Sequence, residues 1–395
     1  MRPLAYLAWV AGSILTLAVL TVALTTIVDP YRLFGTAEIA GWTALKPRIY
    51  EQRGIAKTYQ LERIVPATLL LGNSRVEIGL DPESAQWPRD SGPVFNAAEG
   101  GASLFVAWRR LQEAIAVSPP KVVILGLDFP DFLERPSDPQ ASLPPPSADE
   151  RRLLVNRDGL PNPDRPAQIW RDQLAATLTI DGLLDSIITL TDQKPWSSVT
   201  MTTHGFNPLH EYRVHVQRSG YYALFAQKNA VYQKQYGMSR HPDFDDTSRS
   251  ASFHFLDRIM LLAQEHSFRL ILFIPPYHAQ YLDILHQAKL WSSFEAWKRA
   301  LVRTISARSD PLRGSITLLD FSGYNQFTTE PVPRQGDLRT EMSWYWESGH
   351  YKPALGDEII ARFFGAKSHF GQELTPSTID AVLADIGESR IGSVP

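Results

Sequence analysis

The segment Thr68-Leu-Leu-Leu-Gly-Asn-Ser74-Arg75 decides which fold this sequence predicts. An apolar run that stops at Gly-Asn-Ser is typical of a buried parallel strand that carries a hydroxyl at its carboxyl end. Other apolar runs of strand length alternate with stretches of helical spacing, at 93–98, 121–128, 269–276 and 316–320. This alternation predicts an α/β fold: a five-stranded parallel sheet with crossover helices on both faces, in a three-layer sandwich.

Other regions flank or interrupt this pattern. An apolar N-terminus, 1–28, is followed by a juxtamembrane connector of mixed charge, 29–64, and by the α/β domain, 65–365. Residues 132–250 interrupt the domain with proline-rich, helical and aromatic segments, including one helix expected from Asp172 to Leu190. We expect this mainly helical and loop insertion over the strand ends, either as a lid or binding loop or as mere decoration. Residues 366–395 form a tail with one helix.

The N-terminus predicts a membrane anchor. The run from Leu4 to Val28 contains no charged residue and exceeds the ~20 residues that a spanning helix needs. A secretory apolar region is shorter, about 7–15 residues, and no clear Ala-x-Ala site precedes Asp29, which favours a retained signal anchor. A strict count of the basic residues that follow the span would keep them cytoplasmic. Large domains translocate largely regardless of that count, so we expect the domain outside the cytoplasm.

Composition excludes several functions. Hydrophobic residues make up 44% of the chain, charged residues 21%, and the net charge is −3. This is an ordinary folded protein with no electrostatic reason to bind nucleic acid. The chain has no cysteine, which excludes thiol catalysis, cysteine-bound zinc and disulfides. His204, His210 and His215 do not match a metal-binding spacing, and no metal or cofactor is expected.

Ser74 and a histidine late in the sequence, His350, are the candidate catalytic residues. A serine hydroxyl is a poor nucleophile until a base removes its proton, and His350 lies in a polar loop before the last core helix. Glu347, three residues earlier, would orient the ring, as in a serine triad. The alternatives are a helix-capping serine, a structural histidine and an exposed carboxylate.

Three segments resemble the SGNH (GDSL-like) hydrolase superfamily, a flavodoxin-like fold. Gly72-Asn-Ser-Arg75 is similar to its block I, Asn96-Ala-Ala-Glu-Gly-Gly101 to block II, and Glu347-Ser-Gly-His350 to block V. The resemblance covers residues 65–130 and 252–365 and implies an oxyanion hole made by the N–H groups of Ser74 and Gly101. With the anchor, the chain looks most like the membrane-anchored branch, similar to the D-alanyl transfer protein of teichoic acid synthesis and the alginate O-acetylation proteins.

The chain departs from the family pattern at three places. Asn73 and Glu347 stand where the family usually has Asp, and Asp128 stands where block III usually supplies an Asn to the oxyanion hole. A carboxylate facing an oxyanion would be repulsive, so Asp128 is expected to hold Arg75, orient His278 or bind a substrate hydroxyl. Other candidate substrate contacts are Arg75, His278 and Tyr351.

The resemblance implies a serine acyl esterase or O-acyltransferase, with acetyl as the expected group. It would lie in the bacterial inner membrane, act on a cell-envelope or exported polysaccharide, and work beside a multispanning membrane O-acyltransferase. The alternative is a catalytically inactive scaffold of a polysaccharide assembly complex, which the departures at Asp128 and Glu347 favour modestly. The two differ in geometry: an esterase needs Ser74 Oγ and His350 within hydrogen-bond reach and Glu347 on the other ring nitrogen.

Overall fold

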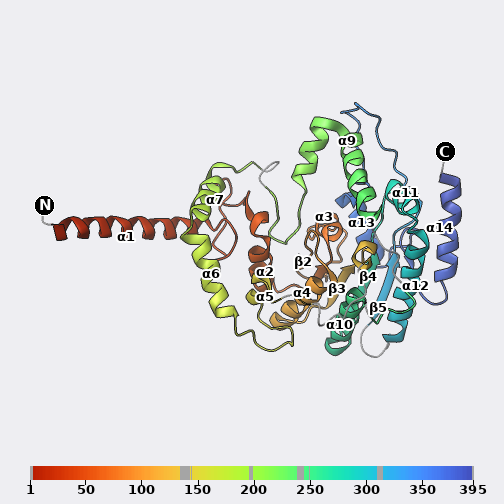
Figure 1. The fold of residues 1–395 in the computed structure, drawn as a ribbon, viewed down its shortest axis with the longest axis horizontal. Helices are drawn as coiled ribbons and strands as arrows, with labels where there is room; N and C mark the ends of the chain where they lie inside the picture. Colours follow the sequence, from red (N-terminus) through yellow and green to blue (C-terminus); the bar gives the residue numbers. More distant parts are fainter. Residues whose placement is uncertain are drawn as a thin grey trace. The chain divides into compact units, whose positions relative to one another are not determined.

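The computed structural model describes residues 3–133, 143, 145–194, 199–237, 244–248, 250–308 and 315–393. The chain divides into two compact units (Figure 1): residues 1–64 with 146–203, and residues 65–145 with 204–395. The segment expected to be one insertion, 132–250, is therefore divided. Its first helical part belongs with the N-terminal segments, and its aromatic part belongs with the α/β unit.

The α/β unit contains a six-stranded sheet in the order β2-β1-β3-β4-β5-β8. The parallel strands are β1 (Thr68–Leu71), β2 (Val94–Asn96), β3 (Val122–Gly126), β4 (Arg269–Ile274) and β5 (Ile316–Asp320). β8 (Gln372–Glu373) pairs antiparallel with β5. The α/β class and the parallel strands are confirmed, but the sheet is mixed and has a sixth strand. Two residues are too few to show a strand pattern in sequence.

Helices cover both faces of this sheet. Successive strand residues point to opposite faces, and all residues from Leu69 to Leu71 and from Leu270 to Ile274 are buried. The helices of the unit are α3 (Ser74–Gly79), α4 (Leu104–Val117), α9 (His210–Gly237), α10 (Ala251–His266), α11 (Ala279–Gln287), α12 (Trp291–Arg308), α13 (Pro353–Phe363) and α14 (Ile379–Ser393), with a 3-10 turn, η2 (Phe129–Phe132). One core cluster joins Leu70 and Ile271 of the sheet to Leu224 of α9 and Ile359 of α13.

A small hairpin holds the late histidine. β6 (Tyr345–Glu347) pairs antiparallel with β7 (His350–Tyr351), and Glu347 lies opposite His350. The sequence analysis expected only a loop here. The strands are again too short to show an alternating pattern, but they hold the two side chains in a fixed register.

The other unit begins with α1 (Pro3–Val28), a helix long and apolar enough to cross a membrane, whose most apolar window makes no burying contact with the protein. Its other helices are η1 (Ile49–Gln52), α2 (Arg53–Ile64), α5 (Ala148–Arg152), α6 (Arg165–Thr177) and α7 (Ile180–Thr191). The single helix expected from Asp172 to Leu190 is wrong: α6 and α7 meet at a bend of 59°. The Thr179 side chain caps α7 through the N–H of Gly182, which fixes a new helix start.

Candidate active site

Ser74 lies at a tight turn between β1 and α3. Gly72 has φ +142°, and a Cβ there would come within 2.6 Å of Val76, so the turn requires glycine. Asn73 caps α3, because its side chain accepts the N–H of Arg75 at 3.1 Å. The helix-capping role considered for Ser74 therefore belongs to Asn73, and the Ser74 hydroxyl stays available for another partner.

That partner is His350. The Ser74 Oγ lies 2.8 Å from His350 Nε2, although 276 residues separate them in sequence. The other ring nitrogen, Nδ1, is hydrogen-bonded to Glu347 Oε1 across the β6–β7 hairpin. Both contacts have the geometry that a serine nucleophile, its base and an orienting carboxylate require.

Glu347 is fully buried and held by three donors. The N–H of Gly349 donates to Oε2 at 2.8 Å, and the hydroxyl of Tyr232 donates to Oε1 at 3.2 Å, in addition to His350. Burial by itself raises the pKa of Glu347, but the His350 ring, the Gly349 N–H and the Arg75 charge together lower it below its ordinary value. The carboxylate is thus kept charged opposite the ring that would become a cation.

The pair remains accessible. Ser74 is half-buried, and the His350 side chain keeps 14% of its surface exposed. The Tyr212 ring, from the start of α9, meets the His350 ring edge-on with their centres 6.2 Å apart. Burial, followed by the charge of Glu347, raises the pKa of Tyr212 well above its usual range. Tyr212 is therefore a neutral wall of the site.

Asp128 does not face this pair. Its carboxylate pairs with the Arg75 guanidinium and accepts hydrogen bonds from Asn73 Nδ2 at 2.7 Å and Tyr277 Oη at 2.6 Å. The Arg75 guanidinium lies 5.2 Å from the ring centres of Tyr277 and Tyr281. The expected Arg75–Asp128 pair is therefore formed in the structure, buried beneath the Ser74 turn. The carboxylate's charge is matched there by a cation.

The backbone N–H groups of Ser74 and Gly101 are those expected to form the oxyanion hole. Within the described part of the chain, neither the N–H of Ser74 nor that of Gly101 donates to another protein group. Gly101 has φ +74° in the loop after β2. The loop is fastened to the Ser74 turn because Glu99 N–H donates to the Gly72 carbonyl at 3.2 Å.

The Asn96 side chain stabilises the backbone of α3 and of the loop after β2. Its Nδ2 donates to the carbonyls of Val76 and Leu80 at 2.9 Å each, at the end of α3. Its Oδ1 accepts the N–H of Ala98 at 3.1 Å. Asn96 therefore positions the short helix that begins at Ser74.

The expected substrate contacts are buried instead: Arg75, Asp128, His278 and Tyr351 are each at most 5% exposed. His278 caps α11 through the N–H of Gln280 and donates from Nε2 to the carbonyl of Glu330 at 2.8 Å. Burial lowers the pKa of His278 to about 4, so it is neutral at pH 7. Arg75, Asp128 and His278 bond to other protein groups, so we assign these three to positioning rather than to substrate contact. Among the described residues the buried Tyr351 hydroxyl has no hydrogen-bond partner.

Sequence reasoning missed Tyr232 and the neighbouring Asn229, both on α9. Asn229 accepts the hydroxyl of Ser348, in the hairpin turn, and donates to Gln280 at 2.8 Å. A Cβ at Gly349 would come within 2.4 Å of the Tyr232 hydroxyl, so that glycine allows the close approach. The tyrosine-rich composition of 204–237 was the available signal, but it does not identify which tyrosine reaches the hairpin.

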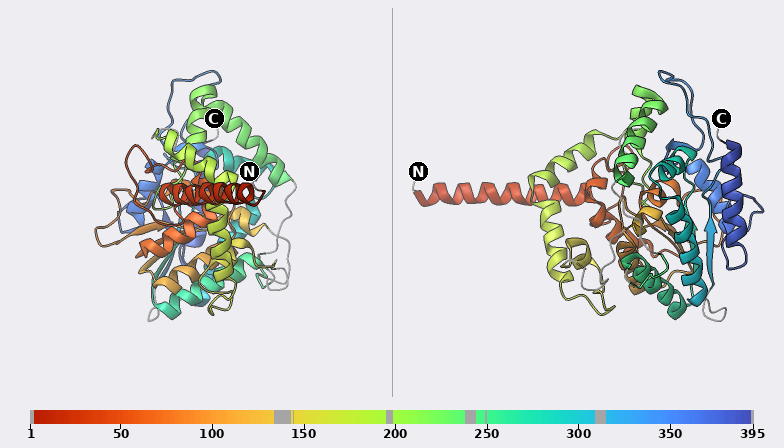
Figure 2. Two further views of the ribbon diagram at one scale, coloured as in Figure 1. Left: turned by 90° about the vertical axis from the view of Figure 1, so that its left-hand side faces the viewer. Right: turned by 45° about the vertical axis from the view of Figure 1, so that its right-hand side comes forward.

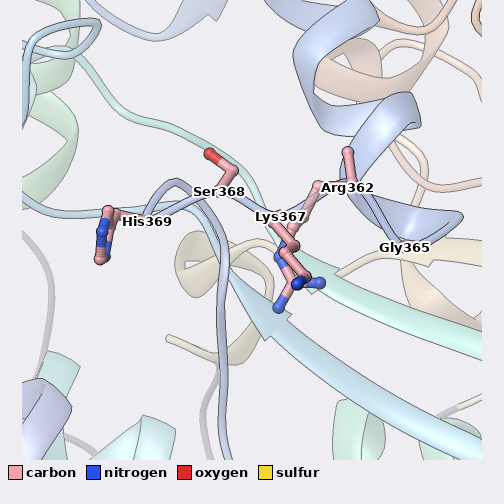
Figure 3. Close-up of a pocket in the computed structure, with 6 residues that line it drawn as sticks. Arg362, Gly365, Lys367, Ser368 and His369 are labelled. Carbon is pink, nitrogen blue, oxygen red and sulfur yellow. The ribbon is translucent and has the colours of Figure 1, made fainter.

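A basic pocket lies elsewhere in the α/β unit. It has a volume of about 400 Å³ and is lined by residues at the end of α13 and in the loop after it: Arg362, Gly365, Ala366, Lys367, Ser368 and His369. Figure 3 shows the His369 ring apart from the Arg362 and Lys367 side chains, so the lining groups do not converge on one point. Across the described ranges, no group of three or more His, Cys, Asp or Glu side chains is arranged to hold a metal ion.

Comparison with known proteins adds no assignment. No family model matches the chain, and no curated protein matches it. The Ser74–His350–Glu347 geometry therefore carries the functional argument.

Proposed function

We propose that this chain is a membrane-anchored serine acyl esterase or O-acyltransferase. The observation that carries the proposal is the contact between Ser74 Oγ and His350 Nε2, 2.8 Å, with Glu347 bonded to the opposite ring nitrogen. An inactive scaffold would not need to keep a hydroxyl, an imidazole and a buried carboxylate in this order.

Each group has one task in the proposed reaction. His350 Nε2 takes the Ser74 proton while Ser74 Oγ attacks an acyl carbonyl carbon, and Glu347 stabilises the imidazolium that results. The N–H groups of Ser74 and Gly101 bind the negative oxygen of the tetrahedral intermediate. His350 then gives its proton to the leaving alcohol oxygen, and the acyl group stays on Ser74.

The second half repeats these steps with another nucleophile. His350 takes a proton from water or from a glycan hydroxyl, which attacks the acyl-serine and releases Ser74. The resemblance to the membrane-anchored SGNH branch supports acetyl as the group, a cell-envelope or exported polysaccharide as the acceptor, and a multispanning O-acyltransferase as the partner. α1 supports a single membrane anchor, and the resemblance supports the bacterial inner membrane as its location, with the α/β unit outside the cytoplasm.

Covalent labelling tests the nucleophile without knowing the acceptor. The full-length chain in detergent is treated with a fluorophosphonate, which reacts with activated serines, and with p-nitrophenyl acetate. We expect labelling and burst release of p-nitrophenol by the unaltered chain, and loss of both in Ser74→Ala and His350→Ala. Ser368→Ala, which removes an exposed hydroxyl, serves as the matched control and should keep both. An unlabelled native chain, or equal labelling of Ser74→Ala, would favour the scaffold alternative.

A further inference from the structure

The large apolar side chains of α6 and α7 point away from the protein. On a surface helix of a water-soluble domain they would point towards the core. The fully buried residues are polar or small: Gln168, Asp172, Ala176, Thr177, Gly182, Ser186 and Thr189. Ile169 is partly buried beside Ala176. The side chains that face outward are large and apolar, between 43% and 77% exposed: Trp170, Leu174, Leu178, Ile180, Leu184 and Ile187. We call the second set the apolar stripe. It follows spacings of three and four residues along each helix.

The inward face is polar because it is engaged in a buried network. Asp172 accepts from Arg152 Nε at 2.5 Å, from Gln168 Nε2 at 2.9 Å and from Tyr59 Oη at 3.1 Å. A buried carboxylate satisfied in this way fixes the rotation of α6. The apolar stripe is therefore turned outward by well-bonded interior contacts.

The two helices sit at one end of α1. The first residues of α1 with buried side chains are Thr25 and Val28, and the Tyr31 hydroxyl, just after α1, donates to Asp185 of α7 at 2.7 Å. Figures 1 and 2 show α6 and α7 lying across the line of α1 where α1 meets them.

The length of α1 sets the depth of this contact. Its 26 residues span about 39 Å at ~1.5 Å per residue, while the hydrocarbon core of a bilayer is about 30 Å thick. A span that begins near Pro3 therefore leaves the hydrocarbon about six residues before Val28, close to where Thr25 becomes buried. The apolar stripe then lies level with the boundary between acyl chains and headgroups.

We propose that the apolar stripe of α6 and α7 is a lipid-binding surface, immersed in the interface of the bilayer that α1 crosses. This rests on α1 being a membrane span and is independent of the chemistry at Ser74. Large apolar residues on one face of a helix, with Trp among them, are what interfacial helices present to lipid. Helices of 13 and 12 residues are each too short to span, since that takes about 20 residues.

The absence of cysteine from the chain makes a site-specific test clean. Leu174→Cys and Leu184→Cys, each in the full-length chain, are spin-labelled and reconstituted in phosphatidylethanolamine–phosphatidylglycerol liposomes. Leu15→Cys, in α1, is the lipid reference, and Leu338→Cys, a leucine of the other unit with 54% exposure, is the aqueous reference. Collision rates with oxygen and with a water-soluble nickel complex report lipid and water contact. Circular dichroism checks that each variant keeps its helices.

We expect both stripe labels to collide several-fold less with nickel than the Leu338→Cys label, and to lie at a shallower depth than the Leu15→Cys label. Nickel collisions as frequent as at Leu338→Cys would overturn the proposal. So would an immobilised label that neither reagent reaches, because it would mean that a protein covers the stripe. Stripe labels as deep as the Leu15→Cys label would also overturn the proposal, because α6 and α7 would then be inserted in the hydrocarbon core and not bound at its interface. If the Leu15→Cys label itself reports water, α1 does not span the bilayer, and the proposal is overturned because its premise is wrong.

Discussion

At the residue scale, the proposed orienting carboxylate is Glu347, which has one methylene more than the aspartate that the resemblance led us to expect. The hairpin absorbs the difference, because Glu347 and His350 are directly paired across β6 and β7. The carboxylate then reaches His350 Nδ1 while His350 Nε2 still reaches Ser74. The departure from the pattern changes the length of the side chain and leaves the order of contacts intact.

Glu347→Gln should therefore be severely impaired. The neutral amide does not stabilise the imidazolium. Its NH₂ group can also donate to His350 Nδ1, which favours the tautomer with the proton on Nε2, and that nitrogen then cannot accept the Ser74 proton. We expect acylation by p-nitrophenyl acetate to slow on the order of 10²–10⁴-fold, the range typical of a lost acid–base function. Glu358→Gln, on the exposed side of α13, should react like the native chain. A Glu347→Gln chain of near-native rate would remove Glu347 from the mechanism.

Tyr232→Phe should have a smaller and more specific effect. It removes one hydrogen bond to Glu347 Oε1, 3.2 Å, worth about 1 kcal/mol, so kcat should fall roughly five-fold. KM should not change, since Tyr232 contacts the carboxylate and not the substrate. Tyr222→Phe, which alters a 44% exposed tyrosine of the same helix, is the control. A change in KM alone would place Tyr232 in substrate binding.

At the element scale, the site depends on the close contact of α3 with α13. A Cβ on Gly356 of α13 would come within 1.8 Å of the carbonyl oxygen of Gly79, the last residue of α3. A Cβ on Gly79 would come within 2.1 Å of the Tyr351 ring. Two glycines thus let the helix that bears Ser74 lie against the segment that follows His350.

Gly356→Ala should push these elements apart. Because the blocking atom is backbone, we expect a loss of about 1–3 kcal/mol in the free energy of unfolding and a slower reaction at Ser74. Gly387→Ala, within α14 and with no atom within 4 Å of the added Cβ, should be neutral or more stable by up to about 1 kcal/mol. Urea unfolding with fluorophosphonate labelling measures both. Equal stability of the two variants would show that α3 and α13 adjust freely.

The sequence predicted the elements that are long enough to show an apolar pattern. β1, β3, β4, β5 and α1 were predictable because each is a mainly apolar run of at least four residues, and β2 because it lies in the longer segment 93–98. Ser74 lies where the first of these strands ends. β8 and the β6–β7 hairpin are two or three residues long, below the length at which a pattern appears. The break between α6 and α7 and the contact of Tyr232 with Glu347 depend on tertiary packing, which local spacing does not report.

At the scale of the whole molecule, buried His278 makes stability depend on pH. Its pKa is about 4 in the folded chain, against about 6.5 when unfolded. A depressed folded pKa contributes stability that is complete above pH ~6.5 and is lost as the pH falls towards ~4, up to about 3 kcal/mol. The unfolded chain binds the proton more readily, so acid favours it.

His278→Asn should flatten this dependence. Asparagine keeps the helix cap but has no titrating ring, so the variant should be less stable than the native chain at pH 7 and should lose less on acidification. Urea midpoints of the full-length chain in detergent, measured between pH 7.5 and 4.5, give both slopes. Parallel curves would show that other groups cause the acid sensitivity.

The separation of 276 positions between Ser74 and His350 also sets an order of events during biosynthesis. A chain grows from its N-terminus at about 5–20 residues per second, so α1 and the serine emerge first and the histidine follows only after tens of seconds. Until then the Ser74 hydroxyl lacks its proposed base, so we expect a nascent chain that ends before His350 to be inert. On the proposed function, Ser74 therefore gains its reactivity only after the segment that carries His350 has been made.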